Sequence, residues 1–355
     1  MPKRSVPPVA APGHWRRLGS PEAGFTYVRA DGKPLRAAGA LARIRRLAIP
    51  PGWADVQISP RPDEKVQAVG IDAAGRKQYL YHPDFVARRA RRKYRRLREF
   101  AAVLPRLREQ TNRDLARPGL PRERVLATVV RLMTRGFFRV GSERYAVENK
   151  TFGITTLRKS HLRIQGQNLV FHYRGKKGVH QHRVVADTPL VEILRELLEL
   201  PGRRLFRYVE EDGTVRNVTA TEVNAYLKEV TGGRYTSKDI RTWGGTVRAA
   251  TILADLGPAA SEREAKRNVA LACKLVSAEL GNTPSVCRSA YIHPAVLERY
   301  LSGETIAPVM RQAPRPVPAA EQVEHYAEEA ALLRFLAGKS CQGAAAGSAA
   351  GSGSS

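Results

Sequence analysis

The chain has 355 residues, of which 43% are hydrophobic, so it is long enough for two or three domains with packed cores. Its 60 Lys and Arg residues outnumber 33 Asp and Glu residues and give a formal net charge of +27. This excess predicts attraction to a polyanion, usually nucleic acid, although charge alone does not choose among DNA, RNA and an anionic membrane. Neither a disulfide framework nor a zinc site fits the three cysteines, Cys273, Cys287 and Cys341.

Both ends of the chain differ in composition from its middle. Residues 1–22 are basic and rich in proline, which predicts a flexible arm, and they lack the apolar segment of a signal peptide. No run of about 18 apolar residues is present, so we expect no membrane partner and a cytoplasmic location. Residues 311–342 are expected to form a C-terminal extension, Pro-rich at first and helical later, and residues 343–355 a disordered tail of Gly, Ala and Ser.

Residues 23–85 contain short strand patterns separated by turn residues, which predicts a small antiparallel β-sheet domain. Two of these strands, over residues 66–71 and 77–81, flank a tight turn as in a hairpin. Cations, an amide and an aromatic ring on this hairpin suit DNA phosphates and base edges. Polar and aromatic residues also alternate in this way on half-exposed hairpins of any function. These candidate DNA contacts are Arg76, Lys77, Gln78 and Tyr79.

A basic cluster follows the hairpin. Residues 85–99 contain eight basic side chains and one acid on a stretch with helical character. Such density is self-repulsive unless a polyanion lies nearby, so contact with phosphates is favoured over a merely solvated face. The change in composition also marks the expected start of a larger, mainly α-helical domain over residues 86–310. The candidate DNA contacts within the cluster are Arg92 and Lys93.

Two arginines of the helical domain stand out by their surroundings. Arg139 lies among apolar residues, two before Gly141, and a buried guanidinium must pair with an acid or await an anion. Arg241 falls in the first turns of a helix that begins near Thr236 or Ser237, where the helix dipole favours an anion. Both positions therefore indicate a site for a negatively charged group.

A lysine occupies the tip of a predicted hairpin. Strands are expected over residues 168–173 and 179–185, and Lys176 lies between them, where it can reach a neighbouring cleft. Glycine-lysine pairs are also common in ordinary turns, and the spacing of a phosphate-binding P-loop is missing. His180 and His182 share one face of the second strand but lack a third ligand nearby, so no metal site is expected.

A tyrosine lies in a segment of small, polar and helix-breaking residues. An amphipathic helix expected over residues 262–280 leads into this segment, in which Tyr291 stands nine residues after Asn282. Most tyrosines are packed aromatics, and the segment alone favours that interpretation over a nucleophile. The arginines and the lysine change the balance, because a free phenol has a pKa near 10 and needs cations to ionise at neutral pH.

Taken in chain order, these residues resemble the active site of the type IB DNA topoisomerases, especially the small poxvirus-like and bacterial form. The matching motifs are Arg-x-Gly at Arg139, the hairpin lysine Lys176, Lys-x-x-Arg from Lys238 to Arg241, and Ser289 to Pro294 around Tyr291. The resemblance covers most of the chain: residues 25–83, with the motifs at 49–53 and 75–79, are similar to the family's N-terminal sheet domain, and residues 126 to about 301 to its catalytic domain. It implies an α+β fold, in which a small antiparallel sheet domain precedes a mainly α-helical catalytic domain that also holds a β-hairpin.

The resemblance also implies a role for each site residue. Tyr291 is the nucleophile that attacks a backbone phosphate and holds the 3′ end of the cut strand. Arg139 and Arg241 bind the nonbridging oxygens, and Lys176 protonates the departing 5′ oxygen. Asn282 stands where poxvirus members have histidine, and it is assigned to oxygen binding because an amide donates a hydrogen bond but carries no proton to transfer.

Double-stranded DNA is the partner that the resemblance implies, with the protein acting as a monomer on the bacterial nucleoid. Relaxation of supercoils then requires neither ATP nor a metal, and no cofactor is expected, because the phosphotyrosine bond conserves the energy for religation. Lys238 is a candidate DNA contact, and both Lys238 and His293 either touch DNA or support the active site.

Two other functions stay open from the sequence. A tyrosine recombinase uses Arg, Lys and Tyr in the same order, but it usually has His-x-x-Arg where this chain has Lys238 and Arg241, and its N-terminal domain is helical. A non-catalytic basic protein that packages DNA would account for the charge without a role for Tyr291.

Overall fold

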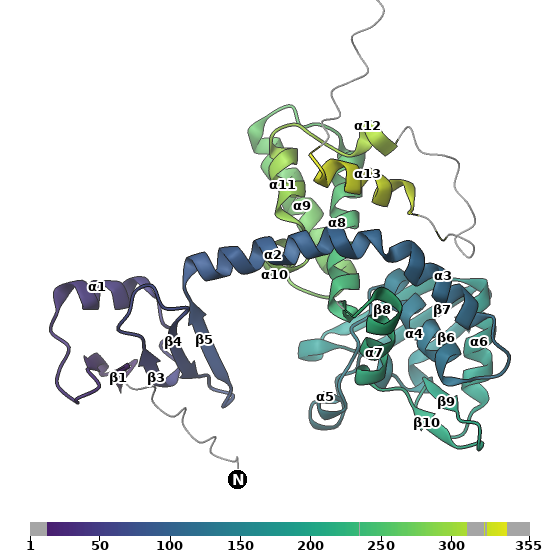
Figure 1. Ribbon diagram of the computed structural model, residues 1–355, viewed down its shortest axis with the longest axis horizontal. Helices are drawn as coiled ribbons and strands as arrows, with labels where there is room; N and C mark the ends of the chain where they lie inside the picture. The colour runs from purple at the N-terminus through teal and green to yellow at the C-terminus, as the bar shows by residue number, and fades with distance from the viewer. Residues whose placement is uncertain (1–12, 234, 311–322, 324, 339–355) are drawn as a thin grey trace, which may run out of the picture. The chain divides into compact units, whose positions relative to one another are not determined.

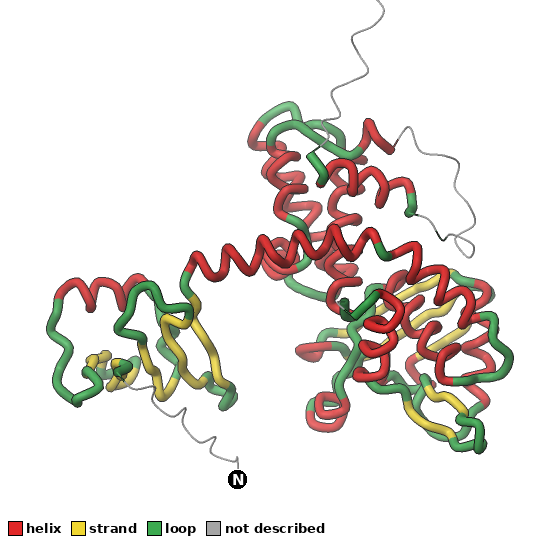
Figure 2. Tube along the Cα trace, viewed as in Figure 1, coloured by secondary structure: helices red, strands yellow, loops and turns green. Residues whose placement is uncertain are grey.

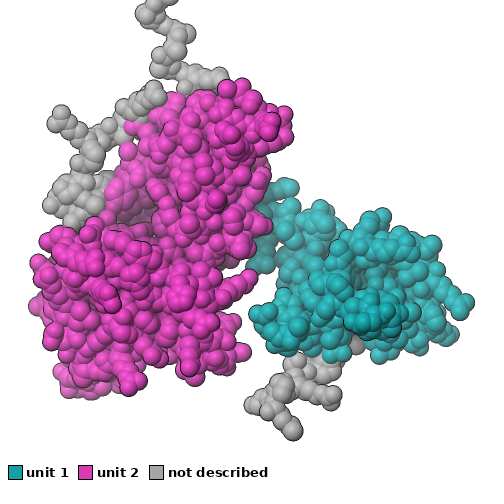
Figure 3. All heavy atoms as spheres, turned by 180° about the vertical axis from the view of Figure 1, so that it is seen from behind, with its two compact units in different colours: residues 1–94 teal, residues 95–355 magenta. Residues whose placement is uncertain are grey.

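The computed structural model describes residues 13–233, 235–310, 323 and 325–338. The chain forms two compact units, residues 1–94 and 95–355, and the division falls inside a long helix, α2 (Pro83–Ala102) (Figure 3). Antiparallel sheet dominates the first unit and helix the second, so the expected α+β class is confirmed. Outside the described residues lie the first part of the expected arm, the Pro-rich stretch, Cys341 and the Gly/Ala/Ser tail.

Five antiparallel strands build the sheet of the first unit, in the order β2-β1-β3-β4-β5 (Figure 1). They are β1 (Trp15–Ser20), β2 (Gly24–Val28), β3 (Ala54–Ile58), β4 (Val66–Ile71) and β5 (Lys77–Tyr81). One helix, α1 (Ala38–Arg46), lies between β2 and β3 in the chain. The hairpin of β4 and β5 has the bounds that the sequence predicts, because strand periodicity and a tight turn are local signals.

Strand β1 corrects the expectation of a flexible arm over residues 1–22. It pairs with β2 on one side and β3 on the other, so it lies inside the sheet. The guanidinium of Arg17 donates to the carbonyl of Pro50 at 3.1 Å and lies 4.1 Å from the centre of the Phe25 ring. The basic composition suggested solvation, but carbonyl groups and an aromatic face within the unit hold this charge instead.

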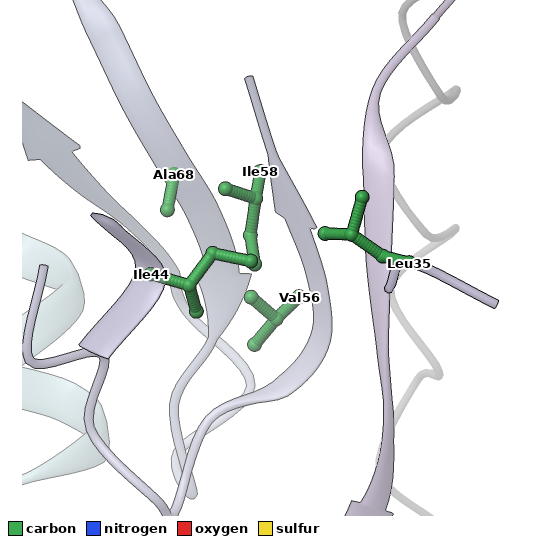
Figure 4. Packing of buried hydrophobic residues seen from close by; sticks show 5 residues of the cluster. All are labelled: Leu35, Ile44, Val56, Ile58 and Ala68. Atoms are coloured by element: carbon green, nitrogen blue, oxygen red, sulfur yellow. The ribbon is translucent and has the colours of Figure 1, made fainter. Parts of the chain in front are cut away.

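Packing of α1 against the sheet forms a hydrophobic core in the first unit. Figure 4 shows its five buried members, which are Leu35, Ile44, Val56, Ile58 and Ala68. Ile44 comes from the helix, whereas Val56 and Ile58 lie two residues apart and therefore on one face of β3. A Cβ on Gly70 would lie 2.9 Å from the Trp53 ring, so glycine allows Trp53 to cover β4. This packing fixes the strand that leads into the hairpin.

The second unit consists mainly of helices, with a sheet of order β6-β7-β8 and a separate two-stranded ribbon (Figure 2). The helices are α3 (Leu104–Leu115), α4 (Arg122–Gly136), α5 (Glu143–Glu148), α6 (Thr188–Glu199), α7 (Ala220–Thr231), α8 (Ser237–Leu256), α9 (Glu262–Leu280), α10 (Pro284–Ala290), α11 (Pro294–Leu301), α12 (Ala307–Met310) and α13 (Ala327–Leu336). The strands are β6 (Leu162–Gln165), β7 (Asn168–Arg174), β8 (His180–Ala186), β9 (Arg207–Val209) and β10 (Val215–Asn217). Within the described ranges, no helix has both the length and the apolar character needed to cross a membrane.

Helix α4 runs through the core of the second unit. Its apolar residues, each at most 1% exposed, form the core that the sequence predicts, and they include Val125, Leu126, Val129, Val130 and Met133. The same helix carries a buried arginine, Arg131, and a half-buried one, Arg135, which reach one oxygen of Asp187 at 2.7 and 2.9 Å. These arginines thus have an internal acid as partner.

A buried carboxylate fastens α13 to the second unit. Glu329 is 7% exposed and accepts hydrogen bonds from Arg108 of α3 at 2.8 and 2.9 Å. It also accepts from the indole nitrogen of Trp243 on α8 at 3.0 Å. One carboxylate therefore joins three helices, and the C-terminal extension is part of the fold in this stretch.

Replacing Glu329 with Ala tests this junction. The change removes a buried acceptor from Arg108 and Trp243, and loss of one partner of a buried ion pair costs about 3–5 kcal/mol. We expect the free energy of unfolding in urea, followed by tryptophan fluorescence, to fall by that amount. Glu109→Ala is the control, since Glu109 pairs with Arg113 at the surface, where a pair contributes about 0–1 kcal/mol. Equal losses in the two variants would contradict the role given to Glu329.

Candidate active site

The C-terminal end of α9 gathers three arginines. The last carbonyl groups of a helix lack donors within the helix and carry the negative end of its dipole. Here Glu279 O accepts from Arg183, Leu280 O from Arg241 at 2.8 Å, and Gly281 O from Arg139 at 2.7 Å. The three cations come from β8, from α8 and from the loop after α4, so one helix end connects three separate elements.

Two glycines hold the segment that carries Arg139. Gly141 has a φ of +101°, and a Cβ on Gly153 would lie 2.7 Å from the carbonyl oxygen of Arg139. This close approach, which only glycine permits, lets the amide of Ile154 donate to the same oxygen at 2.8 Å. The Arg-x-Gly spacing therefore has a steric cause. The guanidinium of Arg139, fixed in this way, also donates to Asn282 Oδ1.

Arg241 lies in the first turns of α8, as the sequence predicts, after Thr236 as N-cap. Its side chain is 3% exposed and donates to the carbonyl of Phe137 as well as to the end of α9. Gly244 and Gly245 follow one turn later. A Cβ on Gly244 would overlap the Phe137 ring, and one on Gly245 would lie 2.9 Å from Tyr291 O. The two glycines thus let both segments lie against the helix that carries Arg241.

Tyr291 ends α10 and lies beside Arg241. The centre of its ring is 5.3 Å from Cζ of Arg241. Its amide donates to Cys287 O at 2.9 Å, and its carbonyl accepts from the hydroxyl of Thr246 on α8 at 3.3 Å. The side chain is half-buried, whereas a packed tyrosine of the same unit, Tyr300, is 2% exposed. Tyr291 is therefore held at its backbone and faces a guanidinium, which distinguishes it from a core aromatic.

No carboxylate pairs with these three guanidiniums among the described residues. Besides carbonyl groups, their partners include the side-chain amides of Asn282 and Gln181 and the hydroxyl groups of Tyr173 and Tyr291. The acid on the end of α9, Glu279, is bound instead to Arg248 at 2.7 Å. The cluster therefore carries positive charge that the protein around it does not balance, and an anion would stabilise it.

The arginines affect each other's protonation. Burial lowers the pKa of Arg241, and the charges of Arg139 and Arg183 lower it further, whereas the Tyr291 phenol opposes this. Burial also lowers the pKa of Arg139, and the charge of Arg183 adds to that effect. Arginine nevertheless remains charged at neutral pH, because its ordinary pKa lies above 12. The repulsion is thus a cost that a bound anion removes.

Hydrogen-bond donors without acceptors also occur in the cluster. Asn282 Nδ2, Arg241 Nε and Arg183 Nε are buried and have no hydrogen-bond partner among the described residues. Because Arg139 donates to Asn282 Oδ1, the amide nitrogen of Asn282 is the group left to donate elsewhere. The thiol of Cys287 lies beside this amide. Burial raises the pKa of the thiol, and the Asn282 amide opposes that shift only in part. Buried donors of this kind are costly unless a ligand accepts from them.

The lysine hairpin is formed by β7 and β8. Lys176 begins a short 3₁₀ turn at its tip, between Gly175 and Gly178, and its side chain is exposed. Within the described part of the chain, Lys176 contacts none of the other four predicted site residues. The structure therefore brings together Arg139, Arg241, Asn282 and Tyr291 and leaves Lys176 on an adjoining element. Lys238 is exposed in the first turn of α8.

Sequence reasoning missed Arg183 and its neighbour Gln181. Both lie on β8, where Gln181, Arg183 and Val185 alternate with exposed residues. A cation on the inward face of a strand was a signal that could have identified Arg183, because a strand directs alternate side chains to opposite faces. The exposed histidines of β8 include His182, which stacks on His172 of β7 with ring centres 4.4 Å apart. Within the described residues no group of three His, Cys, Asp or Glu side chains is arranged to hold a metal ion.

In the first unit, Asp72 orders the predicted DNA-contacting hairpin. Its carboxylate accepts from Arg76 Nε at 2.9 Å and from Gln78 Nε2 at 2.9 Å, while Lys77 and Tyr79 are exposed. The side-chain hydrogen bond from Arg76, followed by that from its backbone amide, lowers the pKa of Asp72 to about 2. Stability from this carboxylate is therefore complete above the ordinary pKa of about 3.9 and is lost as the pH falls through about 2.

Comparisons with known proteins cover both units of the chain. Residues 82–312 match the family model of the eukaryotic DNA topoisomerase I catalytic core, and residues 24–72 match that of the bacterial DNA topoisomerase IB N-terminal domain. The two matches together favour a topoisomerase over a recombinase or a packaging protein. Helix α13 lies beyond the matched residues.

Viral proteins are similar to most of the chain. DNA topoisomerase 1B of Acanthamoeba polyphaga mimivirus is 30% identical over 283 residues, which cover 78% of this chain and 84% of that protein. DNA topoisomerase 1B of vaccinia virus is 26% identical over 268 residues, which cover 72% and 80%. DNA topoisomerase 1 of rabbit fibroma virus is 27% identical over 284 residues, which cover 74% and 82%.

Replacing Asp72 with Ala tests whether the hairpin contacts DNA. Without the carboxylate, Arg76 and Gln78 lose their fixed orientation, so we expect the affinity for a labelled duplex to fall about tenfold, since one hydrogen bond contributes about 0.5–1.5 kcal/mol. Binding is measured at constant salt. Asp31→Ala is the matched control, because Asp31 caps another turn of the same unit through the amide of Lys33. If Asp72→Ala binds as tightly as Asp31→Ala, the hairpin assignment is wrong.

Proposed function

The chain belongs to the type IB DNA topoisomerases, and we propose that it relaxes supercoiled duplex DNA by cutting one strand through Tyr291 and resealing it. The observation that most supports this mechanism is the cluster of guanidiniums beside a phenol, without a balancing carboxylate among the described residues. A backbone phosphate is the anion that fits such a cluster, because guanidinium groups bind phosphate oxygens through two parallel hydrogen bonds.

In the proposed cleavage step, Arg139 and Arg241 bind the nonbridging oxygens of the scissile phosphate. The phenolic oxygen of Tyr291 attacks phosphorus opposite the 5′ oxygen, and its proton passes to solvent. A bond forms between Tyr291 Oη and phosphorus while the bond to the 5′ oxygen breaks, which leaves a 3′-phosphotyrosyl ester. Loss of one donor that stabilises such a transition state costs about 2.7–4 kcal/mol.

Asn282 donates a third hydrogen bond to the phosphate. Its Oδ1 accepts from Arg139, and its Nδ2 is buried without an acceptor among the described residues. The orientation of the amide is therefore set by an arginine that binds the same phosphate. This supports oxygen binding by Asn282 and assigns it no proton transfer.

Lys176 acts as the general acid. It gives a proton to the departing 5′ oxygen, and in religation the 5′ hydroxyl attacks phosphorus, returns that proton and releases Tyr291. Between the two steps the cut strand rotates about the intact one, so supercoils of either sign relax. The ester bond to Tyr291 retains the energy of the broken bond, and the arginines supply the positive charge, so we propose that neither ATP nor a metal takes part.

DNA contacts outside the active site are supplied by exposed basic and aromatic side chains. They include Lys77 and Tyr79 of β5, Arg92 of α2 and Lys238 of α8, while the ammonium group of Lys93 is 3.3 Å from the hydroxyl of Tyr94. Each phosphate that the protein neutralises changes the slope of log affinity against log salt by about −0.9. All proposed site residues come from one chain, so we expect a monomer to act.

Tyr291→Phe separates chemistry from binding. The substitution removes only the phenolic oxygen, so we expect duplex affinity to stay within about twofold of wild type while plasmid relaxation and the covalent adduct are lost. Relaxation is measured on agarose gels with EDTA present and ATP absent, and the 3′-linked adduct on denaturing gels. Tyr27→Phe, at a half-buried tyrosine of β2, is the control that retains both activities. Adduct at wild-type yield in Tyr291→Phe would refute the nucleophile assignment.

Lys176→Ala tests the general acid. A positioned acid contributes about 10²–10⁴-fold, so cleavage of an ordinary duplex should slow by that factor. A duplex with sulfur in place of the scissile 5′ oxygen has a leaving group that needs no proton, and single-turnover cleavage should return to near the wild-type rate. Lys177→Ala removes the neighbouring exposed ammonium group at the same tip and should show no such rescue. Failure of sulfur to rescue Lys176→Ala would remove Lys176 from the role of acid.

A further inference from the structure

Arg183 links the lysine hairpin to the rest of the candidate site. It lies on β8, in the second strand of the hairpin whose tip carries Lys176. Its guanidinium donates to Glu279 O at the end of α9 and, at 2.6 Å, to Gln181 Oε1 on its own strand. A single side chain therefore connects β8 to the helix end that also holds Arg139 and Arg241.

Gln181 forms the second part of this link. It is 6% exposed, and its side chain lies between two glycines. A Cβ on Gly175 would lie 2.8 Å from Gln181 Cγ, and a Cβ on Gly281 would overlap the Gln181 amide, so a larger residue at either position would displace the Gln181 side chain. Gly175 precedes Lys176, and Gly281 precedes Asn282. Gln181 thus contacts the immediate neighbours of the proposed acid and of the proposed oxygen donor.

The charge of Arg183 is difficult to explain as a packing contact alone. Its Nε is buried without a partner among the described residues, and no carboxylate of that part of the chain pairs with its guanidinium. Its charge also disfavours the charged forms of Arg139 and Arg241. An apolar residue would anchor a hairpin without these costs, and costs of this kind concentrate at functional sites.

We propose that Arg183 and Gln181 are positioning residues that fix the hairpin against the end of α9, so that Lys176 is held at the phosphate bound by Arg139 and Arg241. This inference rests on the proposed role of Lys176 as general acid. Loss of the link lets the hairpin shift, and a misplacement of about 1 Å can cost on the order of 100-fold in rate. The step that slows is protonation of the 5′ oxygen. Phosphate binding is unaffected, because Arg139 and Arg241 keep their own carbonyl acceptors on α9.

Single-turnover cleavage of two duplexes, identical except for oxygen or sulfur at the scissile 5′ position, tests the inference. Arg183→Met should cleave the oxygen substrate on the order of 100-fold more slowly than wild type and the sulfur substrate at nearly the wild-type rate. Arg183→Lys should recover part of the loss, since a lysine ammonium group can donate to Glu279 O. The double variant Lys176→Ala with Arg183→Met should be no slower on oxygen than Lys176→Ala alone, because both changes remove one function.

Two further variants control for folding and for charge. Gln181→Met keeps the length of the side chain but removes the acceptor of Arg183, so it should show the same pattern with a smaller loss. The thermal midpoint of Arg183→Met shows whether that variant is folded. If it is not, Gln181→Met alone still decides the test. Arg163→Met removes an exposed arginine from β6 of the same sheet and should cleave both substrates at the wild-type rate.

The outcomes distinguish this inference from the proposed function. Equal slowing of both substrates by Arg183→Met or Gln181→Met, or additive losses in the double variant, overturns the positioning role while sulfur rescue of Lys176→Ala still supports the acid. If sulfur does not rescue Lys176→Ala, the proposed role of Lys176 is wrong and the inference fails with it.

Discussion

The candidate site depends on the hydrogen bonds that the C-terminal end of α9 accepts from three arginines. Its three successive carbonyl groups hold Arg183, Arg241 and Arg139 by hydrogen bonds. Carbonyl oxygens carry only partial charges, so they orient a guanidinium without neutralising it, whereas a carboxylate would orient it and cancel its charge. The helix end therefore fixes three cations in place without cancelling their charge.

This choice of acceptor separates two kinds of buried arginine in a strongly basic chain. Arg131 is bound to Asp187, and Arg108 is bound to Glu329, and these pairs hold helices together. Arg241 is as deeply buried as Arg131 and more buried than Arg108, but it has carbonyl groups as its acceptors. Internal acids thus balance the charges of Arg131 and Arg108, whereas no acid of the described residues balances the charge of Arg241.

Close approach of backbone segments assembles the site around this helix end. Glycines at 153, 244, 245, 175 and 281 stand where a Cβ would meet the carbonyl of Arg139, the ring of Phe137, the carbonyl of Tyr291 or the side chain of Gln181. Each glycine loses more conformational freedom on folding than another residue would, so it destabilises the chain locally. That cost is offset because the approach brings segments far apart in the sequence into hydrogen-bonding distance.

The sequence by itself determined the excess of positive charge, the bounds of the β4–β5 hairpin and of α9, and the order of basic residues before Tyr291. These are local properties, since periodicity, turn residues and motif spacing are read within a short window. Only the tertiary structure showed that Trp15–Ser20 is a strand and that Arg183 joins the cluster. The contacts that decide these features are not local: Arg183 reaches a carbonyl 96 residues away, and Arg139 one 142 residues away. No local pattern specifies which carbonyl a guanidinium will find after folding.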